Sequence, residues 1–253
     1  MNKTGGTIKV LWTGGWDSTF RILSLADKNV RVEPYYLVTD RESKDVEIAT
    51  MQRIQKQIMA RSSTVFTLAP LTLIDESGLQ PDPQITQGFK SLLKRTFIGA
   101  QYEVLALLAK EQQGLELCIH RDDKAFKLIE AVGVTDEFND QAGTNVKLNL
   151  GNSPQDLVTV FGNFHFPILD FTKLDMKAYA ETHGFDDLMN ETWFCFTPIQ
   201  GKPCGLCNPC KYTIEEGMEY RFTDRALQRY KYRTVLLFPK RVYRKIKRTL
   251  KGK

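Results

Sequence analysis

The feature that most constrains the fold is the alternation of short apolar, β-branched runs with longer stretches of helical apolar spacing. Residues 45–60 illustrate the helical stretches, because Ile48, Met51, Ile54 and Ile58 recur on one helical face. Strands that alternate with helices favour right-handed crossovers and a mostly parallel sheet. We therefore predict an α/β protein with a doubly wound sheet, with a mixed α+β arrangement as the alternative. The expected strands cover 7–12, 30–39, 63–69 and 115–120, and the expected helices 17–27, 45–60, 96–112 and 123–132.

Two further stretches have a less regular pattern of apolar residues. Residues 70–90 contain Pro70, Pro81 and Pro83 and are predicted to form a loop or lid. The pattern weakens from about 133 to 165, and a helix is expected to begin near Lys173.

Composition places the chain among ordinary globular proteins, with 42% hydrophobic and 26% charged residues in 253. No signal peptide and no apolar run of membrane-spanning length is visible, so we expect a cytoplasmic protein. The net charge of +5 is unevenly distributed. Residues 229–253 carry eleven Lys or Arg and no acid, which leaves 24 basic against 30 acidic residues in the first 228.

The basic segment ends in "LLFPKRVYRKIKRTLKGK", in which Phe238, Val242, Ile246 and Leu250 recur every four residues. This spacing predicts an amphipathic helix over residues 235–253 for an anionic membrane surface. An RNA-binding tail and a packed or solvated helix are the alternatives.

A glycine-rich turn, "VLWTGGWDST", lies where the first strand meets the first helix. Ligands bind at the carboxyl ends of strands in such sheets, and glycines let the backbone approach a phosphate. The spacing is neither that of a dinucleotide fingerprint nor that of a Lys-containing P-loop. Backbone amides and the hydroxyls of Thr13, Ser18 and Thr19 would therefore carry the binding, unless Gly14 and Gly15 only make a tight turn.

Four of the five cysteines crowd into sixteen residues with the spacing C-x8-C-x2-C-x2-C, whereas Cys118 stands alone. Four thiolates on loops can close a tetrahedral Zn²⁺ site, which would be structural. A redox or catalytic role and an iron–sulfur cluster are the alternatives. The predicted zinc ligands are Cys195, Cys204, Cys207 and Cys210.

These two motifs together carry a family resemblance. "TGGWDST" resembles the S-G-G-x-D-S loop of the ATP-pyrophosphatase (PP-loop) superfamily, with Thr13 for the first Ser. With "PILDFTKLDM", "ETWFC" and "CGLCNPC" added, residues 7 to 220 look like the 7-cyano-7-deazaguanine (preQ0) synthase family of queuosine biosynthesis.

The resemblance implies an adenine nucleotide alpha hydrolase-like fold with a small C-terminal zinc lobe, and an ATP-dependent ligase. Such an enzyme uses MgATP to adenylate a small carboxylate, and ammonia then gives an amide or, after a second activation, a nitrile. It further implies that Asp17 and Ser18 are catalytic, that Asp17 orients the loop or a metal, and that the chain forms a homodimer. The implied ATP-binding residues are Thr13, Gly14, Gly15, Asp17, Ser18 and Thr19.

The middle of the chain departs from the family. "TDRESKDVE" stands where the family has a Y-G-Q-x-H-like stretch, and "CIHRDDKAFKLIE" replaces a Ser-Gly-Tyr-Pro-Asp-Cys-type segment. We therefore predict a diverged member acting on another acceptor. His120, Arg121, Asp122 and Asp123 are site candidates at a strand end, although acids at a helix N-terminus would look the same.

The expected organisation is a PP-loop ATP-binding domain over 1–190, a four-cysteine zinc lobe and helix over 191–228, and the basic tail over 229–253. Two other functions fit the same motifs. One is a PP-loop adenylating enzyme acting on RNA or a different small acceptor, and the other is a nucleotide-binding module without turnover. The intact Asp17–Ser18 pair argues against the second.

Overall fold

The computed structural model describes residues 5–238. The chain divides into two compact units, each described by itself below. The first consists of the residues up to Thr39 together with Glu47–Thr192, and the second of Asp40–Val46 with the residues from Trp193 onward.

The first unit is built on an eight-stranded sheet in the order β3-β2-β1-β5-β8-β7-β6, with β4 also paired to β2. All of its pairings are parallel except those of β6 with β7 and of β7 with β8. The predicted α/β class with a mostly parallel sheet is therefore confirmed. The strands are β1 (Thr7–Leu11), β2 (Arg31–Val38), β3 (Thr67–Leu68), β4 (Thr72–Asp75), β5 (Leu115–Glu116), β6 (Thr135–Asp140), β7 (Gly143–Leu148) and β8 (Phe164–His165).

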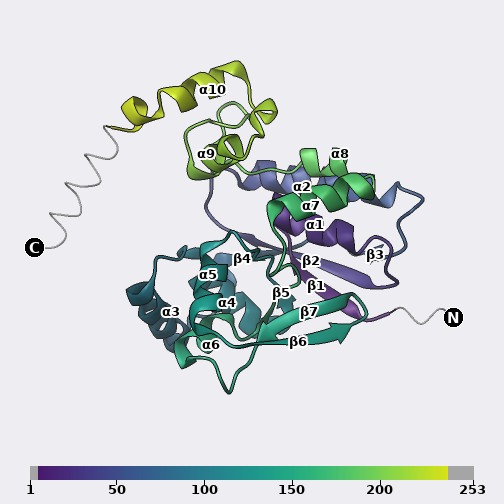
Figure 1. Ribbon diagram of the computed structural model, residues 1–253, viewed down its shortest axis with the longest axis vertical. Helices are drawn as coiled ribbons and strands as arrows, with labels where there is room; N and C mark the ends of the chain where they lie inside the picture. Colours follow the sequence, from purple (N-terminus) through teal and green to yellow (C-terminus); the bar gives the residue numbers. More distant parts are fainter. Residues whose placement is uncertain (1–4, 239–253) are drawn as a thin grey trace, which may run out of the picture. The chain divides into compact units, whose positions relative to one another are not determined.

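Helices cover both faces of this sheet (Figure 1). One face carries α1 (Trp16–Ser24), α2 (Lys44–Met59), α7 (Lys173–Thr182) and α8 (Asp186–Asn190). The other carries α3 (Pro83–Arg95), α4 (Gln101–Glu111), α5 (Lys124–Val132) and α6 (Gln155–Phe161).

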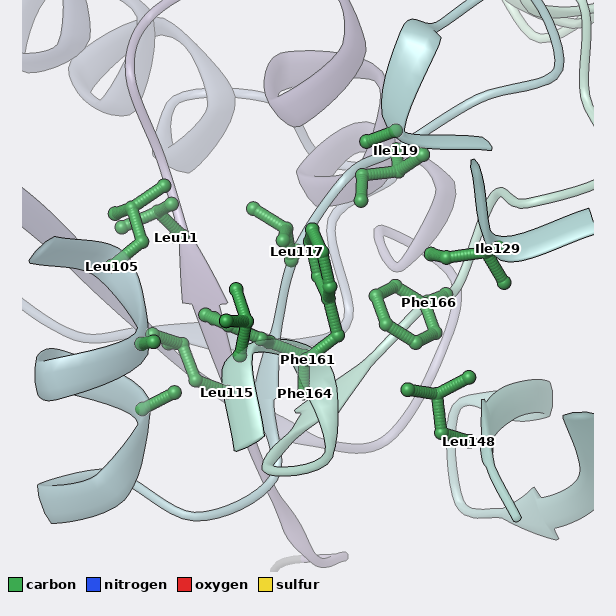
Figure 2. Packing of buried hydrophobic residues seen from close by; sticks show 14 of the residues in the cluster. Leu11, Leu105, Leu115, Leu117, Ile119, Ile129, Leu148, Phe161, Phe164 and Phe166 are labelled. Atoms are coloured by element: carbon green, nitrogen blue, oxygen red, sulfur yellow. The ribbon is translucent and has the colours of Figure 1, made fainter. Parts of the chain in front are cut away.

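Two hydrophobic clusters fill the space between the sheet and these helix layers. Successive strand residues point to opposite faces, so Val10 joins the cluster under α1 and Leu11 the one under α4. Figure 2 shows the second cluster, to which β5 contributes Leu115, β8 contributes Phe164 and α4 contributes Leu105. Burial on both faces explains why these strands read as continuous apolar runs.

The strand order reverses next to β1. The chain goes from β1 to β2 on one side and later returns to β5 on the other. In open α/β sheets the ligand binds at such a switch point, outside the carboxyl ends of the strands. The residues after β1 and β5 are therefore placed together at this edge.

The predicted loop or lid over 70–90 is wrong, because the segment contains β4, a 3-10 turn (Glu76–Gly78) and most of α3. Asp82 caps α3 by accepting hydrogen bonds from the amides of Gln84 and Ile85. Pro83 then occupies the first helical position, where its missing N–H costs nothing. Gly88 marks close helix packing rather than a turn, since an added Cβ would lie 3.1 Å from Thr159 of α6.

The weak pattern over 133–165 conceals the antiparallel hairpin of β6 and β7, followed by α6. β6 lies at the sheet edge, and none of its residues is fully buried. A strand of this kind needs little apolar sequence, which is why the pattern fades there.

The second unit contains α9 (Asn208–Glu215), a 3-10 turn (Glu219–Arg221) and α10 (Asp224–Lys231), packed around three buried cysteines. Residues 239–253 of the predicted amphipathic tail lie outside the described residues. Between residues 5 and 238, no helix is long and apolar enough to cross a membrane.

Candidate functional site

The glycine turn directly follows β1 at the switch point. Gly14 has φ +68°, a conformation that favours glycine. A Cβ at this position would also lie 3.0 Å from Met51 Cγ and 3.4 Å from the carbonyl oxygen of Glu47. Backbone conformation and close packing against α2 therefore both require glycine here.

Hydrogen bonds close the turn on itself. The amide of Thr13 donates to Ser18 Oγ at 3.2 Å, the two hydroxyl oxygens lie 3.2 Å apart, and the amide of Gly15 donates to Thr13 Oγ1 at 3.4 Å. Gly15 is the N-cap of α1 and supplies no side-chain cap. First-turn amides without a capping side chain form an anion-binding site, because they combine free donors with the positive end of the helix dipole.

Thr19 has a different environment from the rest of the motif. Its side chain is fully buried, and Trp12 Nε1 donates to its Oγ1 at 2.9 Å. The structure therefore brings Thr13, Gly14, Gly15, Asp17 and Ser18 into one turn and places Thr19 in the core beneath it. The predicted phosphate contact of Thr19 stays a prediction.

A buried histidine connects the ends of β1 and β5. The Nε2 atom of His120 lies 3.7 Å from Asp17 Oδ1 and 3.6 Å from Asp123 Oδ1. The amide of Asp122 donates to His120 Nδ1 at 3.3 Å, so the neutral ring carries its proton on Nε2, facing the two carboxylates. Asp17 Oδ1 is buried and accepts no hydrogen bond from the described residues.

The same site perturbs the ionisation of Asp123. Burial raises its pKa to about 6, although the charge of His120 opposes the shift, and the charge of Asp17 adds to it. The charge of Lys173, at the start of α7, also lowers the pKa of Asp123. His120 and Asp123 thus lie beside the turn, whereas Asp122 is exposed on the Nδ1 side of His120 and Arg121 forms a 3.4 Å ion pair with exposed Asp170.

A buried ion pair lies beneath the site and was not predicted from the sequence. Arg21 of α1 donates from Nε and Nη2 to Glu116 of β5 at 2.8 and 2.7 Å, and Asn145 of β7 donates to the same carboxylate at 2.9 Å. The signal was present as a single charge within each of the apolar runs "TFRILSL" and "LELCI". Charged residues are almost never fully buried unless they are paired.

A second buried acid lies close to the turn. Glu47 of α2 accepts a hydrogen bond from the Tyr36 hydroxyl at 2.6 Å, and its backbone carbonyl borders Gly14. Its side chain thus joins α2 to β2, while its backbone lies against the turn.

The four cysteines of the second unit converge on one point. Their sulfur atoms all lie within 4.8 Å of one another, with 3.7 Å between Cys204 and Cys210 and 3.9 Å between Cys207 and Cys195. Tetrahedral zinc with Zn–S bonds of about 2.3 Å requires sulfur separations of about 3.8 Å. All four are free thiols, so the donor set and its spacing fit Zn²⁺.

The backbone around these thiols also favours metal binding. The amides of Leu206 and Cys207 both donate to Cys204 Sγ at 3.3 Å, which stabilises a thiolate. Gly205 has φ +74°, and a Cβ there would lie 2.1 Å from the carbonyl oxygen of Ala226. The tight turn between Cys204 and Cys207 therefore packs directly against α10.

Comparison with known proteins agrees with both motifs. A family model described as "Queuosine biosynthesis protein QueC" matches residues 7–219. Curated 7-cyano-7-deazaguanine synthases from two strains of Bacteroides fragilis are each 27% identical over 235 residues, covering 85% of this chain and 96% of theirs. The match runs from β1 through the cysteine centre, as the resemblance predicted, and the chain belongs to the QueC family.

Proposed function

We propose that this chain uses MgATP to adenylate the carboxylate of a small acceptor and transfers ammonia to it, giving an amide or a nitrile as 7-cyano-7-deazaguanine synthases do. The observation that carries the proposal is the turn from Thr13 to Ser18. It combines a glycine at positive φ, a helix start without a side-chain cap, and an acid with an unsatisfied buried oxygen, all at the switch point of the sheet.

The chemistry consists of two displacements. A carboxylate oxygen of the acceptor attacks the α-phosphorus of ATP, and pyrophosphate leaves. The nitrogen of ammonia then attacks the acyl carbon, AMP leaves with the carboxylate oxygen, and the nitrogen loses one proton to solvent, which gives the amide. For a nitrile, the amide oxygen attacks the α-phosphorus of a second ATP and pyrophosphate leaves. The nitrogen then loses its two remaining protons to solvent as the oxygen departs with AMP.

The protein's contribution is to stabilise the charge that develops on pyrophosphate. The first-turn amides of α1 are fixed before the reaction, so they need no reorganisation as the charge appears. The hydroxyls of Thr13 and Ser18 are oriented by their mutual contact and by the Thr13 amide. Asp17, with its unsatisfied buried oxygen, is the residue we assign to Mg²⁺, which would neutralise phosphate charge.

We assign a structural role to Zn²⁺. Four thiolates fill a tetrahedral site and leave no position for substrate. Zinc would then fix the loops of the second unit, and we assign it no chemical step.

We further propose that the acceptor differs from 7-carboxy-7-deazaguanine. His120 and Asp123 occupy the segment in which the family's Ser-Gly-Tyr-Pro-Asp-Cys-type residues are replaced. His120 lies 3.7 Å from Asp17 and 3.6 Å from Asp123, so an imidazole and a second carboxylate lie beside the turn.

Pyrophosphate release from ATP, measured with a panel of carboxylic acids including 7-carboxy-7-deazaguanine, tests the proposal. We expect release that depends on one acid, and a loss of about 100-fold in Asp17→Asn. Asp27→Asn, an exposed acid just after α1, is the matched control and should retain the activity. Efficient turnover of 7-carboxy-7-deazaguanine would refute a different acceptor.

The other outcomes separate the rival functions. Release that requires tRNA would favour the RNA-modifying alternative. ATP binding without turnover under every condition would leave only a nucleotide-binding module.

A further inference from the structure

The second unit presents a helical face that is packed on one side only. Helical residues 233–238 follow α10 after a turn at Tyr232. Ala226 is fully buried, and the guanidinium groups of Arg229 and Arg233 donate to the carbonyl oxygens of Cys204 and Leu206 at 2.7 and 2.9 Å. This side is therefore fixed to the cysteine loop, and the opposite side faces outward.

The outward side becomes apolar along the chain. It begins with the polar residues Arg225 and Gln228, and it continues with four large apolar side chains within seven residues. These are Tyr232, Val235, Leu236 and Phe238, with exposed fractions of 57%, 72%, 49% and 64%.

A shallow hollow of about 590 Å³ runs along the same side, between Arg225 and Leu236. Single exposed apolar residues are ordinary on soluble proteins, but a cluster of this kind marks an interaction surface. We call Tyr232, Val235, Leu236 and Phe238 the apolar face.

The positive charge of the sequence that follows the apolar face indicates what kind of partner this face binds. Residues 239–253 follow the apolar face directly and contain eight Lys or Arg and no acid. Apolar side chains beside a continuous basic sequence suit a surface that offers both hydrocarbon and negative charge.

We propose that the apolar face binds the surface of a bilayer that contains anionic lipid. A second copy of the chain suits this face poorly, because it would bring two like-charged segments together. RNA suits it less well, since only Tyr232 and Phe238 of the four side chains can stack on bases, whereas all four can enter hydrocarbon. Tyr232 fits the polar–apolar boundary of a bilayer, where its ring and hydroxyl are both accommodated. This inference is independent of the proposed ligase activity.

Co-sedimentation of the full-length protein with vesicles tests the proposal. One set of vesicles is phosphatidylcholine alone, and the other is equal parts phosphatidylcholine and phosphatidylserine. We expect pelleting only with the second set, decreasing as salt is added. The double variant Val235→Ser/Leu236→Ser should lower the partition coefficient about tenfold, because two half-exposed apolar side chains no longer enter the bilayer.

The matched control is Val65→Ser/Leu174→Ser, which removes the same two residue types from exposed positions of the first unit. It should pellet as the unaltered protein does. Circular dichroism and zinc content of both double variants show that each is folded.

Four results would overturn the proposal. The first is no pelleting with phosphatidylserine vesicles, and the second is equal pelleting of the unaltered protein and Val235→Ser/Leu236→Ser. The third is a loss of self-association in that variant, measured by sedimentation velocity, together with no vesicle binding by either protein. This result would assign the apolar face to contact with a second copy of the chain. Binding of tRNA in place of vesicles would likewise assign it to RNA.

Discussion

Replacing Arg21 by methionine is expected to lower the free energy of unfolding of the first unit by about 3–5 kcal/mol at neutral pH, which is the usual cost of removing one partner from a buried ion pair. The side chains of Arg21 and Glu116 are 7% and 2% exposed, so water cannot take the place of the lost guanidinium. Methionine keeps the length and most of the apolar stem. Glu116 would retain only the hydrogen bond from Asn145.

The cost should depend on pH. Burial raises the pKa of Glu116 even while Arg21 opposes the shift, so without Arg21 the pKa in the folded state rises further. A carboxyl group whose folded pKa is raised favours the folded state at low pH and loses that advantage as the pH rises from the unfolded pKa, about 4.3, to the folded one. Arg21→Met should therefore be closer to the unaltered protein at pH 4 than at pH 8.

Urea unfolding followed by tryptophan fluorescence measures these differences, since Trp12 is buried directly beneath α1. With a slope of about 3 kcal/mol/M, the midpoint of Arg21→Met should fall by roughly 1 M or more at pH 8. The double variant Arg21→Met/Glu116→Gln should recover to within about 2 kcal/mol, because glutamine is neutral and still accepts the Asn145 bond.

Two results would refute the reasoning. One is an equal loss of stability at pH 4 and pH 8, which would mean that an unpaired charge is not the cause. The other is a double variant as unstable as Arg21→Met, which would attribute the loss to packing.

Three further changes test other parts of the structure. Gly14→Ala should weaken MgATP binding roughly tenfold by titration calorimetry, because φ +68° costs an alanine about 1–2 kcal/mol, whereas Gly78→Ala, in open space at ordinary φ, should bind as before. Cys210→Ser should contain less zinc than the unaltered protein when zinc is measured by atomic absorption, because three thiolates bind the metal less tightly than four. Full zinc content in this variant would contradict a four-thiolate site. Gly205→Ala should be less stable than Gly201→Ala by about 2 kcal/mol or more in thermal unfolding. Both glycines have positive φ, but only Gly205 lacks room for a Cβ. Equal losses of stability would show that the turn can move away from α10.

The parts of the fold that were predictable from the sequence are those with a strong local signal. The strand over 7–12 and the helix over 45–60 are found as β1 and α2 with ends shifted by at most one residue, because each buries an apolar run or stripe. The helix over 83–95 was missed because Pro81, Pro83 and Gly88 in and just before its first half suggested a loop, although Pro83 is the first residue of the helix and Gly88 serves helix packing. The hairpin of β6 and β7 was missed because edge strands carry little apolar signal.

The candidate site divides in the same way. The glycine turn and the cysteine cluster are each made of residues close together in the sequence. Both could therefore be predicted from their spacing. The contact between Asp17 and His120 joins residues about one hundred positions apart in the sequence. It forms because the strand order places the ends of β1 and β5 side by side. Sequence patterns identified His120 as a candidate by its place after a strand, but they could not say what it faces.

α1 contacts both β5 and the segment that follows it. Asp17 and Arg21 are four residues apart and share a helix face, and they contact His120, four residues beyond the end of β5, and Glu116 of β5. α1 runs opposite to β5, so Asp17 meets His120 at the carboxyl end and Arg21 meets Glu116 below it. The buried ion pair thus joins α1 to β5 one helical turn below the first-turn amides. Substitutions at Glu116 should therefore alter nucleotide binding from beneath the turn, without removing any group that contacts the nucleotide.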